Sequence, residues 1–301
     1  MKNYPSKLLL FGEYGLLTGS AGLAIPYNRF YGSLKLYTMG QATGFQIKSN
    51  WVINRFAEYL GKNKQLIFEF EQLSIELSNG LYFESNIPEH TGLGSSAAMC
   101  AAIYERYCLN IKEDINDIRN DLAQMVNFFH PKSSGNDALI SYLNKPLLFQ
   151  ANGDIKEIDI PKSLNGDQLN FFLVDSQYPG NPASLIEEIM LRYRDADYKA
   201  KIDNYYLPLT NNCVESLIDG DKNRFFEELK ALINFQLDFL EFAYPQYLVP
   251  IIQEGLKNNL FYLKIMGAGG GGYLIGFTQN LELCKEYFNK QKIKIIPIQV
   301  N

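Results

Sequence analysis

The stretch that decides the fold is PEHTGLGSSAAM, which occupies positions 88–99. Two glycines, Gly92 and Gly94, lead directly into an alanine-rich segment that begins at Ser95 and has strong helix propensity. The first turn of a helix leaves four backbone N–H groups unpaired, and the helix dipole places partial positive charge there. Because glycine lets the backbone approach an anion closely, the pattern predicts a phosphate cradle. A serine-capped helix after a glycine turn is the structural alternative.

This stretch does not match two other glycine-rich motifs. No Gly-Lys-Ser/Thr sequence follows the glycines, so the loop is not a P-loop. It also lacks the GxSxG pattern of hydrolases. The chain has just two histidines, His90 and His130, neither in a suitable context, so the residues do not favour a Ser-His-Asp triad.

Length and composition set the broad class. The chain has 301 residues, 47% of them hydrophobic and 20% charged, which predicts a globular protein of one large domain or two. A net charge of −5 without a Lys/Arg-rich run argues against a nucleic-acid partner. No apolar run is long enough for a membrane helix. The cysteines lack CxxC spacing, so we expect buried thiols in a cytoplasmic protein; they are Cys100, Cys108, Cys213 and Cys284.

Strands and helices occur in runs rather than in strict alternation, which predicts an α+β fold. Strands are expected at 7–11, 32–38, 66–70, 73–77, 146–150, 155–158, 170–175, 261–266, 273–277 and 294–298. Helices are expected from residue 95, and over 114–129, 181–193, 198–218, 222–240, 249–257 and 281–290. The polar, turn-rich segment 163–167 marks the expected boundary between domains 1–165 and 166–301.

Three further stretches could carry chemistry. Residues 264–273 (KIMGAGGGGY) hold five glycines within six positions, more than a hairpin needs, which predicts close approach of the backbone to a ligand or to the other domain. Residues 130–137 (HPKSSGND) form a polar loop in which Asp137 could simply be a helix cap. Residues 7–15 (KLLLFGEYG) could be a buried strand with Lys7 and Glu13 solvated at its ends.

Together and in this order, the four stretches resemble the GHMP kinase family, the galacto-, homoserine, mevalonate and phosphomevalonate kinases. Within the family, the likeness is greatest to mevalonate kinases, whose glycine-glutamate and Ser-Gly-x-Asp motifs are similar to residues 12–13 and 134–137. The resemblance implies a two-domain α+β fold, with an N-terminal ribosomal-protein-S5-like, ATP-binding domain and a C-terminal ferredoxin-like α/β domain. It also implies a kinase that phosphorylates a hydroxyl of a small molecule, with ATP and Mg²⁺, and mevalonate as the first candidate acceptor.

The resemblance implies a role for each matching residue. Asp137 is the implied base or orienter of the substrate hydroxyl, with Lys7 beside it. The implied ATP-binding residues are Gly92, Leu93, Gly94, Ser95, Ser96 and Ala97, and Ser96 also contacts the metal. The implied substrate-binding residues are Glu13, Tyr14, His130, Ser134, Gly269 and Gly270, although His130 could instead anchor its loop.

Three positions depart from the mevalonate kinase pattern. Val126 stands where a magnesium-binding glutamate is usual, Tyr14 where a histidine is usual, and Asn181-Pro182 where a serine-threonine pair is usual. Phosphomevalonate kinase, for which Lys132 could meet the substrate phosphate, and a related decarboxylase therefore stay open. A non-catalytic homologue that binds a nucleotide or a metabolite also stays open. The chain could also form a homodimer.

Overall fold

The structure is a computed structural model that describes residues 2–38, 40–89, 91–161, 169–178 and 182–299, without the side chains of residues 182 and 183. The chain forms two compact units. The first comprises Met1–Leu8, Ile25–Glu89 and Leu93–Lys145, and the second comprises Leu9–Ala24, His90–Gly92 and Pro146–Asn301. These limits differ from the expected division at 165/166. The expected boundary segment 163–167 lies outside the described residues, and the division into domains 1–165 and 166–301 stays a prediction.

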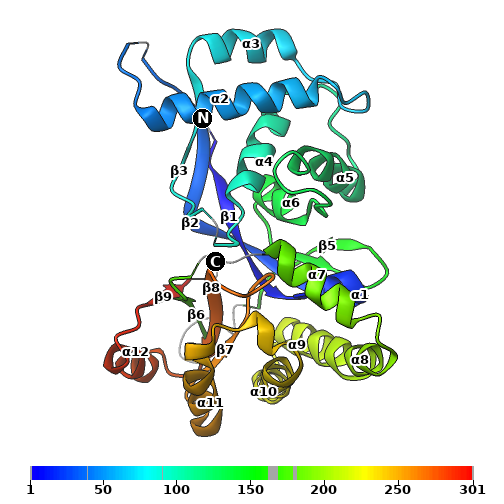
Figure 1. Ribbon diagram of the computed structural model, residues 1–301, viewed down its shortest axis with the longest axis vertical. Coiled ribbons are helices and arrows are strands. Elements are labelled where there is room, and N and C mark those ends of the chain that lie inside the picture. The colour runs from blue at the N-terminus through cyan, green and yellow to red at the C-terminus, as the bar shows by residue number, and fades with distance from the viewer. Residues whose placement is uncertain (1, 39, 90, 162–168, 179–181, 300–301) are drawn as a thin grey trace. The chain divides into compact units, whose positions relative to one another are not determined.

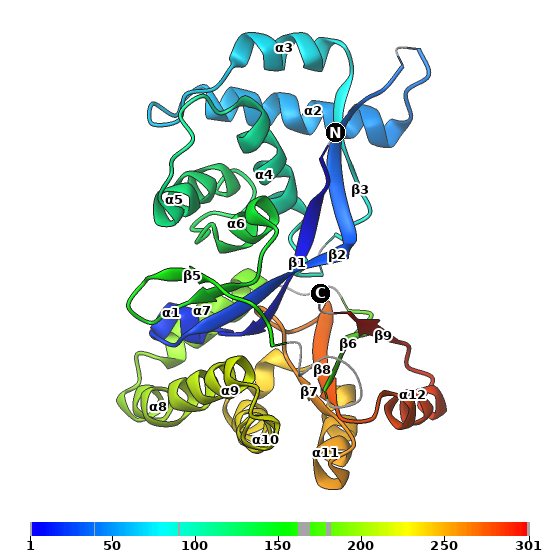
Figure 2. The same cartoon turned by 180° about the vertical axis from the view of Figure 1, so that it is seen from behind.

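The first unit combines strands with a group of helices. Its elements are the start of β1 (Tyr4–Phe11), most of β2 (Gly22–Leu36), α2 (Gly44–Leu60), α3 (Phe70–Ser78), β3 (Leu81–Ser85), α4 (Ser95–Tyr107), α5 (Ile115–Val126) and α6 (Asn136–Leu143). β2 and β3 are antiparallel, with Gly32 opposite Ser85. Figures 1 and 2 show α4, α5 and α6 gathered together, and the alanines of α4 are buried among them.

One predicted strand of this unit is wrong. Residues 73–77 belong to α3, because the buried side chains there are Leu73, Glu76 and Leu77, which share one helical face. Ile75, which completed the alternating strand pattern, is 50% exposed. Glu76 lies on the buried face because it pairs with Arg106 and accepts a hydrogen bond from the Tyr107 hydroxyl. The segment before it, predicted as a strand at 66–70, makes only an isolated bridge between Phe68 and Cys108.

The second unit contains a four-stranded antiparallel sheet in the order β7-β8-β6-β9. Its strands are β6 (Asn170–Asp175), β7 (Tyr262–Lys264), β8 (Tyr273–Thr278) and β9 (Ile295–Ile298). The helical segments are α7 (Pro182–Arg192), α8 (Ala196–Lys201), η2 (Ile202–Tyr206), α9 (Leu207–Asp219), α10 (Lys222–Phe239), η3 (Glu241–Ala243), η4 (Gln246–Leu248), α11 (Val249–Asn258) and α12 (Leu281–Lys290). In Figure 2, α9 and α10 lie side by side.

The rest of the second unit comes from segments earlier in the chain. The short helix α1 (Gly15–Thr18) follows β1, and β4 (Leu147–Phe149) pairs with the start of β2 and with β5 (Ile155–Glu157). The apolar face predicted for α10 is buried, and Phe225 packs against Phe11 and Phe277.

The fold class and the state of the cysteines agree with the sequence predictions. Strands were wrongly predicted at 66–70 and 73–77, and α1, α2, β3 and α6 were not predicted. The fold still combines runs of strands and helices in the predicted α+β pattern. All four cysteines are buried free thiols, as predicted. Among the described residues, no helix is long and apolar enough to cross a membrane.

Candidate active site

The predicted phosphate cradle lies at the N-terminus of α4. Gly92 and Gly94 have φ angles of 78° and 86°, in the left-handed region that favours glycine. The N-cap residue is Gly94, and no described side chain caps the helix, so the alternative of a serine-capped helix is wrong. A Cβ atom added at Gly92 would meet nothing within 4 Å. The start of this helix therefore offers backbone N–H groups and partial positive charge to an anion.

Lys7 and Asp137 meet in the same unit. The Lys7 Nζ atom lies 3.1 Å from Asp137 Oδ1, and the Lys7 backbone N–H donates to the Leu93 carbonyl. A Cβ atom built on Gly94 would lie 3.4 Å from Lys7 Cγ and 4.0 Å from Asp137 Cβ. The glycine turn, the strand that carries Lys7 and the helix that carries Asp137 thus converge on one place.

The two side chains of this pair differ in exposure. The Lys7 side chain is 6% exposed, whereas that of Asp137 is 48% exposed. Burial of Lys7 shows that the interpretation of this lysine as a solvated strand end is wrong. Because only Lys7 is enclosed, the Asp137 carboxylate stays accessible from solvent. Asp137 can therefore contact a ligand while its neighbour holds the opposite charge.

Gly135 determines where Asp137 lies. It is the N-cap of α6, with φ 79°, so Asp137 stands in the first turn of the helix rather than at its cap. A Cβ atom at Gly135 would lie 2.3 Å from the Arg119 carbonyl oxygen and 2.8 Å from the Ala123 nitrogen. Only glycine allows this contact with the α5 backbone. The neighbouring Ser134 is exposed, and its hydroxyl accepts a weak bond from the Asn136 N–H at 3.4 Å.

His130 contacts the cradle. Its Nε2 atom lies 3.0 Å from Ser96 Oγ, the oxygen that the family resemblance implies as a metal ligand. Val126, at the position of the usual glutamate, is buried at the end of α5. Among the residues that the structure describes, no three His, Cys, Asp or Glu side chains are grouped to hold a metal ion. The available donors, the Ser96 hydroxyl and the Asp137 carboxylate, fit Mg²⁺ that keeps most of its ligands as phosphate oxygens and water.

Glu13, predicted to bind substrate, is engaged elsewhere in the second unit. It is 1% exposed, and its Oε1 atom lies 2.5 Å from Nζ of Lys264, which is fully buried. The interpretation of Glu13 as a solvated strand end is therefore wrong as well. Tyr14 has φ 55°, is 6% exposed, and donates its hydroxyl proton to the Ala268 carbonyl at 2.5 Å. Burial and the Glu13 charge raise the pKa of Tyr14, which keeps this donor protonated.

The glycine-rich loop between β7 and β8 packs closely on its own unit. Gly269 and Gly270 have φ angles of 68° and 73°. A Cβ atom at Gly269 would lie 2.5 Å from the Ala243 carbonyl oxygen, and one at Gly270 would lie 2.4 Å from a Leu185 methyl carbon. The predicted close approach of the backbone therefore involves protein atoms here. Substrate contact by Glu13, Tyr14, Gly269 and Gly270 stays a prediction.

Part of the first unit is similar to a known protein family. Residues 50–145 match the family model described as "GHMP kinases N terminal domain". The match includes α4, α5 and α6, and so contains Ser96, His130 and Asp137.

Mevalonate kinases are among the similar proteins. The mevalonate kinase of Dictyostelium discoideum is 22% identical over 223 residues, which is 64% of this chain and 55% of that protein. The L. major mevalonate kinase, solved with R-mevalonate, has a TM-score of 0.70 at 16% identity and covers 99% of this chain and 95% of its own. The phosphomevalonate kinase of Streptococcus pneumoniae, solved with phosphomevalonate and AMPPNP, has a TM-score of 0.69 at 13% identity and covers 99% of both chains. These structural matches confirm the predicted two-domain GHMP fold.

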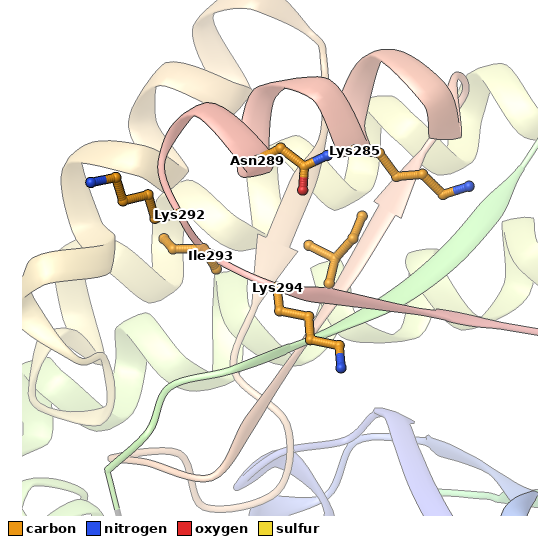
Figure 3. Close-up of a pocket in the computed structure, with 6 residues that line it drawn as sticks. Lys285, Asn289, Lys292, Ile293 and Lys294 are labelled. Atoms are coloured by element: carbon orange, nitrogen blue, oxygen red, sulfur yellow. The ribbon is translucent and has the colours of Figure 1, made fainter.

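A separate cavity of about 360 Å³ lies beside α12 in the second unit. None of the residues that line it is a predicted site residue. Lys285, Lys292 and Lys294 line it, but in Figure 3 their side chains extend in different directions rather than toward one point. Lys285 also pairs with Glu282. The cavity lacks the converging donors of an anion site.

The sequence patterns indicate no role for Lys264, which begins the glycine-rich stretch 264–273. A single charge in the otherwise apolar segment FYLKIM was the available signal. A lysine at a strand position that is fully buried needs a partner, because an unpaired buried charge is costly. The partner, Glu13, lies 251 residues away in the chain.

Proposed function

We propose that this chain is a kinase that transfers the γ-phosphoryl group of ATP to a hydroxyl of a small molecule, and that the acceptor is mevalonate, giving mevalonate 5-phosphate. The observation that carries the proposal is the ion pair of Lys7 and Asp137 beside Gly94 and the uncapped N-terminus of α4. It combines a carboxylate that can contact a hydroxyl, a fixed positive charge and an anion-binding helix start.

Each group has a distinct task in this mechanism. The N–H groups at the start of α4 hold the phosphates. The half-exposed Asp137 carboxylate accepts a hydrogen bond from the acceptor hydroxyl, orients it and takes up its proton. The Lys7 ammonium offsets the charge that spreads over the phosphoryl oxygens during transfer. Since phosphoryl transfer demands positioning and charge neutralisation more than covalent chemistry, these few groups are sufficient.

Mg²⁺ belongs to the proposal as well. Ser96 and Asp137 would hold it, and when bound it supplies positive charge to the phosphates. The contact between Ser96 and His130 fixes the hydroxyl, because the Ser96 proton can be donated to the imidazole, which leaves the oxygen lone pairs for the cation. Val126 offers no such ligand.

A phosphorylated acceptor is the second candidate. The similarity to the Streptococcus pneumoniae phosphomevalonate kinase supports it, as does Lys132, which is exposed in the loop five residues before Asp137 and has φ 65°. A lysine in this loop could meet a substrate phosphate.

The test is ADP release from Mg-ATP with mevalonate, phosphomevalonate, galactose and homoserine as acceptors. We expect turnover with mevalonate. Turnover with phosphomevalonate instead, lost in Lys132→Ala, would select the second candidate. If ATP binds but no acceptor is used, the chain is a nucleotide-binding homologue and the proposal is wrong.

Asp137→Asn serves as the active-site variant and Asp117→Asn as its matched control. Both remove a carboxylate from the first turn of a helix in the same unit, and Asp117 is exposed. We expect Asp137→Asn to lower kcat by about 100- to 10,000-fold and Asp117→Asn to leave it unchanged. Equal activity of the two variants would exclude a catalytic role for Asp137.

A further inference from the structure

Lys264 makes an unusually complete set of contacts. Its Nζ atom donates to Glu13 Oε1 at 2.5 Å, to the Leu10 carbonyl at 2.9 Å and to the Ile265 carbonyl at 2.8 Å. A lysine ammonium has three N–H donors, and all three are used here. Lys264 is 0% exposed and Glu13 is 1% exposed. Burial lowers the pKa of Lys264, and the Glu13 carboxylate opposes that shift.

These contacts join three segments of the second unit. Leu10 is near the end of β1, Glu13 is in the turn that follows, and Ile265 leads from β7 into the glycine loop. Two neighbouring bonds extend the connection. The Tyr206 hydroxyl donates to the Glu13 carbonyl at 2.6 Å, and the Tyr14 hydroxyl donates to the Ala268 carbonyl inside the glycine loop.

Stability alone does not account for such a pair. Removing two charges from water is costly, and well-packed apolar side chains of similar volume are often as stable as a buried ion pair or more so. What apolar side chains do not supply is direction. Three hydrogen bonds from one ammonium admit a single arrangement of the strand end, the turn and the loop, whereas apolar packing tolerates small shifts.

We propose that Lys264 is a positioning residue of the kinase, acting through Glu13 and Leu10. It fixes the end of β1, the strand that carries Lys7 three residues before Leu10, and it fixes the turn from which Tyr14 holds the glycine loop. In this role Glu13 serves Lys264 rather than the acceptor. The inference rests on the proposed function for its kinetic consequence, but its structural consequence can be measured without activity.

The test is the double variant Lys264→Met/Glu13→Leu, which replaces the ion pair by apolar side chains. The matched control is Lys35→Met/Glu84→Leu, which removes a lysine–glutamate pair that also joins two strands but is about half-exposed at both ends. We expect both variants to unfold at the denaturant midpoint of the wild type or above it. We expect kcat to fall roughly 10- to 100-fold in the first variant alone, with the KM of the acceptor and the Kd of the nucleotide unchanged.

Hydrogen exchange separates this inference from the kinase proposal. Peptides covering residues 10–16 and 265–273 should exchange faster in the double variant and at the wild-type rate in the control. If the wild type has no kinase activity, the kinase proposal fails while this readout still decides whether Lys264 positions the turn and loop.

Two outcomes would overturn the positioning role. One is a folded double variant with wild-type kcat and wild-type exchange, which would make the pair structural only. The other is a rise in acceptor KM at constant kcat, which would make Glu13 a direct acceptor contact. If the double variant does not fold, Glu13→Gln replaces it, since the amide keeps the shape and an acceptor oxygen. Wild-type kcat and exchange in folded Glu13→Gln would then exclude the role.

Discussion

The pair Lys7–Asp137 in the first unit and the pair Lys264–Glu13 in the second both take their lysine from a strand, but they differ in exposure. In the first unit, Asp137 is 48% exposed although Lys7 is almost buried. In the second unit, Lys264 and Glu13 are both enclosed, at 0% and 1% exposure. The open pair leaves carboxylate oxygen free to meet a ligand. The closed pair uses every donor of its lysine within the protein.

The difference indicates how the same two functional groups serve different purposes. A half-exposed carboxylate keeps much of its hydration, so the open pair costs little to maintain. The closed pair loses hydration on both sides, and the use of all three N–H donors of Lys264 offsets that cost. We therefore expect the open pair to take part in phosphoryl transfer and the closed pair to position the turn and the glycine loop.

The largest effect on stability is expected from breaking the closed pair. Lys264→Met leaves the Glu13 carboxylate buried without its partner, which should lower the free energy of unfolding by about 3–5 kcal/mol. Lys7→Met leaves Asp137 in contact with water and should cost less than about 1 kcal/mol. Urea denaturation of both variants measures the contrast. Equal losses would remove the distinction between the pairs.

A smaller loss of stability is expected from moving the helix that carries the open carboxylate. Gly135→Ala combines an unfavourable φ with a Cβ atom that clashes with the α5 backbone, and it should cost about 2–4 kcal/mol. The control is Gly153→Ala, where φ is 91° but a Cβ atom would meet nothing within 4 Å. That control should lose only about 1 kcal/mol. Equal midpoints in thermal unfolding would show that contact with α5 does not place Asp137.

The smallest effect is expected on nucleotide binding, from removing the contact between His130 and the Ser96 hydroxyl. His130→Ala frees the Ser96 hydroxyl and should weaken nucleotide binding in the presence of Mg²⁺ by about tenfold. Nucleotide binding without Mg²⁺ should not change. Calorimetric titration with ADP, with and without Mg²⁺, measures both. An equal loss under the two conditions would mean that His130 supports the loop and not the metal ligand.

Local sequence was enough to predict the glycine turn and the helix beside the open pair, whereas the pairing of Lys7 with Asp137 was implied only by the family resemblance. The glycine turn and the alanine-rich helix at 92–107 depend on neighbours in sequence, and the structure contains both features. The burial of Glu13 depends on its pairing with Lys264, and no local sequence pattern connects the two residues. Leu73, Ile75 and Leu77 alternate with polar residues, which is typical of a strand. The helix could not be predicted there because the burial of Glu76 depends on Arg106, which is distant in sequence. Helix α2 was not predicted, although Thr43 and Gln46 form a capping box at its start.

The most direct test of the central claim is the single-turnover rate of γ-phosphoryl transfer from labelled ATP to mevalonate by wild type, Asp137→Asn and Asp117→Asn. All three proteins should bind nucleotide equally. Transfer should be about 100- to 10,000-fold slower in Asp137→Asn and unchanged in Asp117→Asn. Transfer at the wild-type rate by Asp137→Asn would contradict the assignment of chemistry to the open pair.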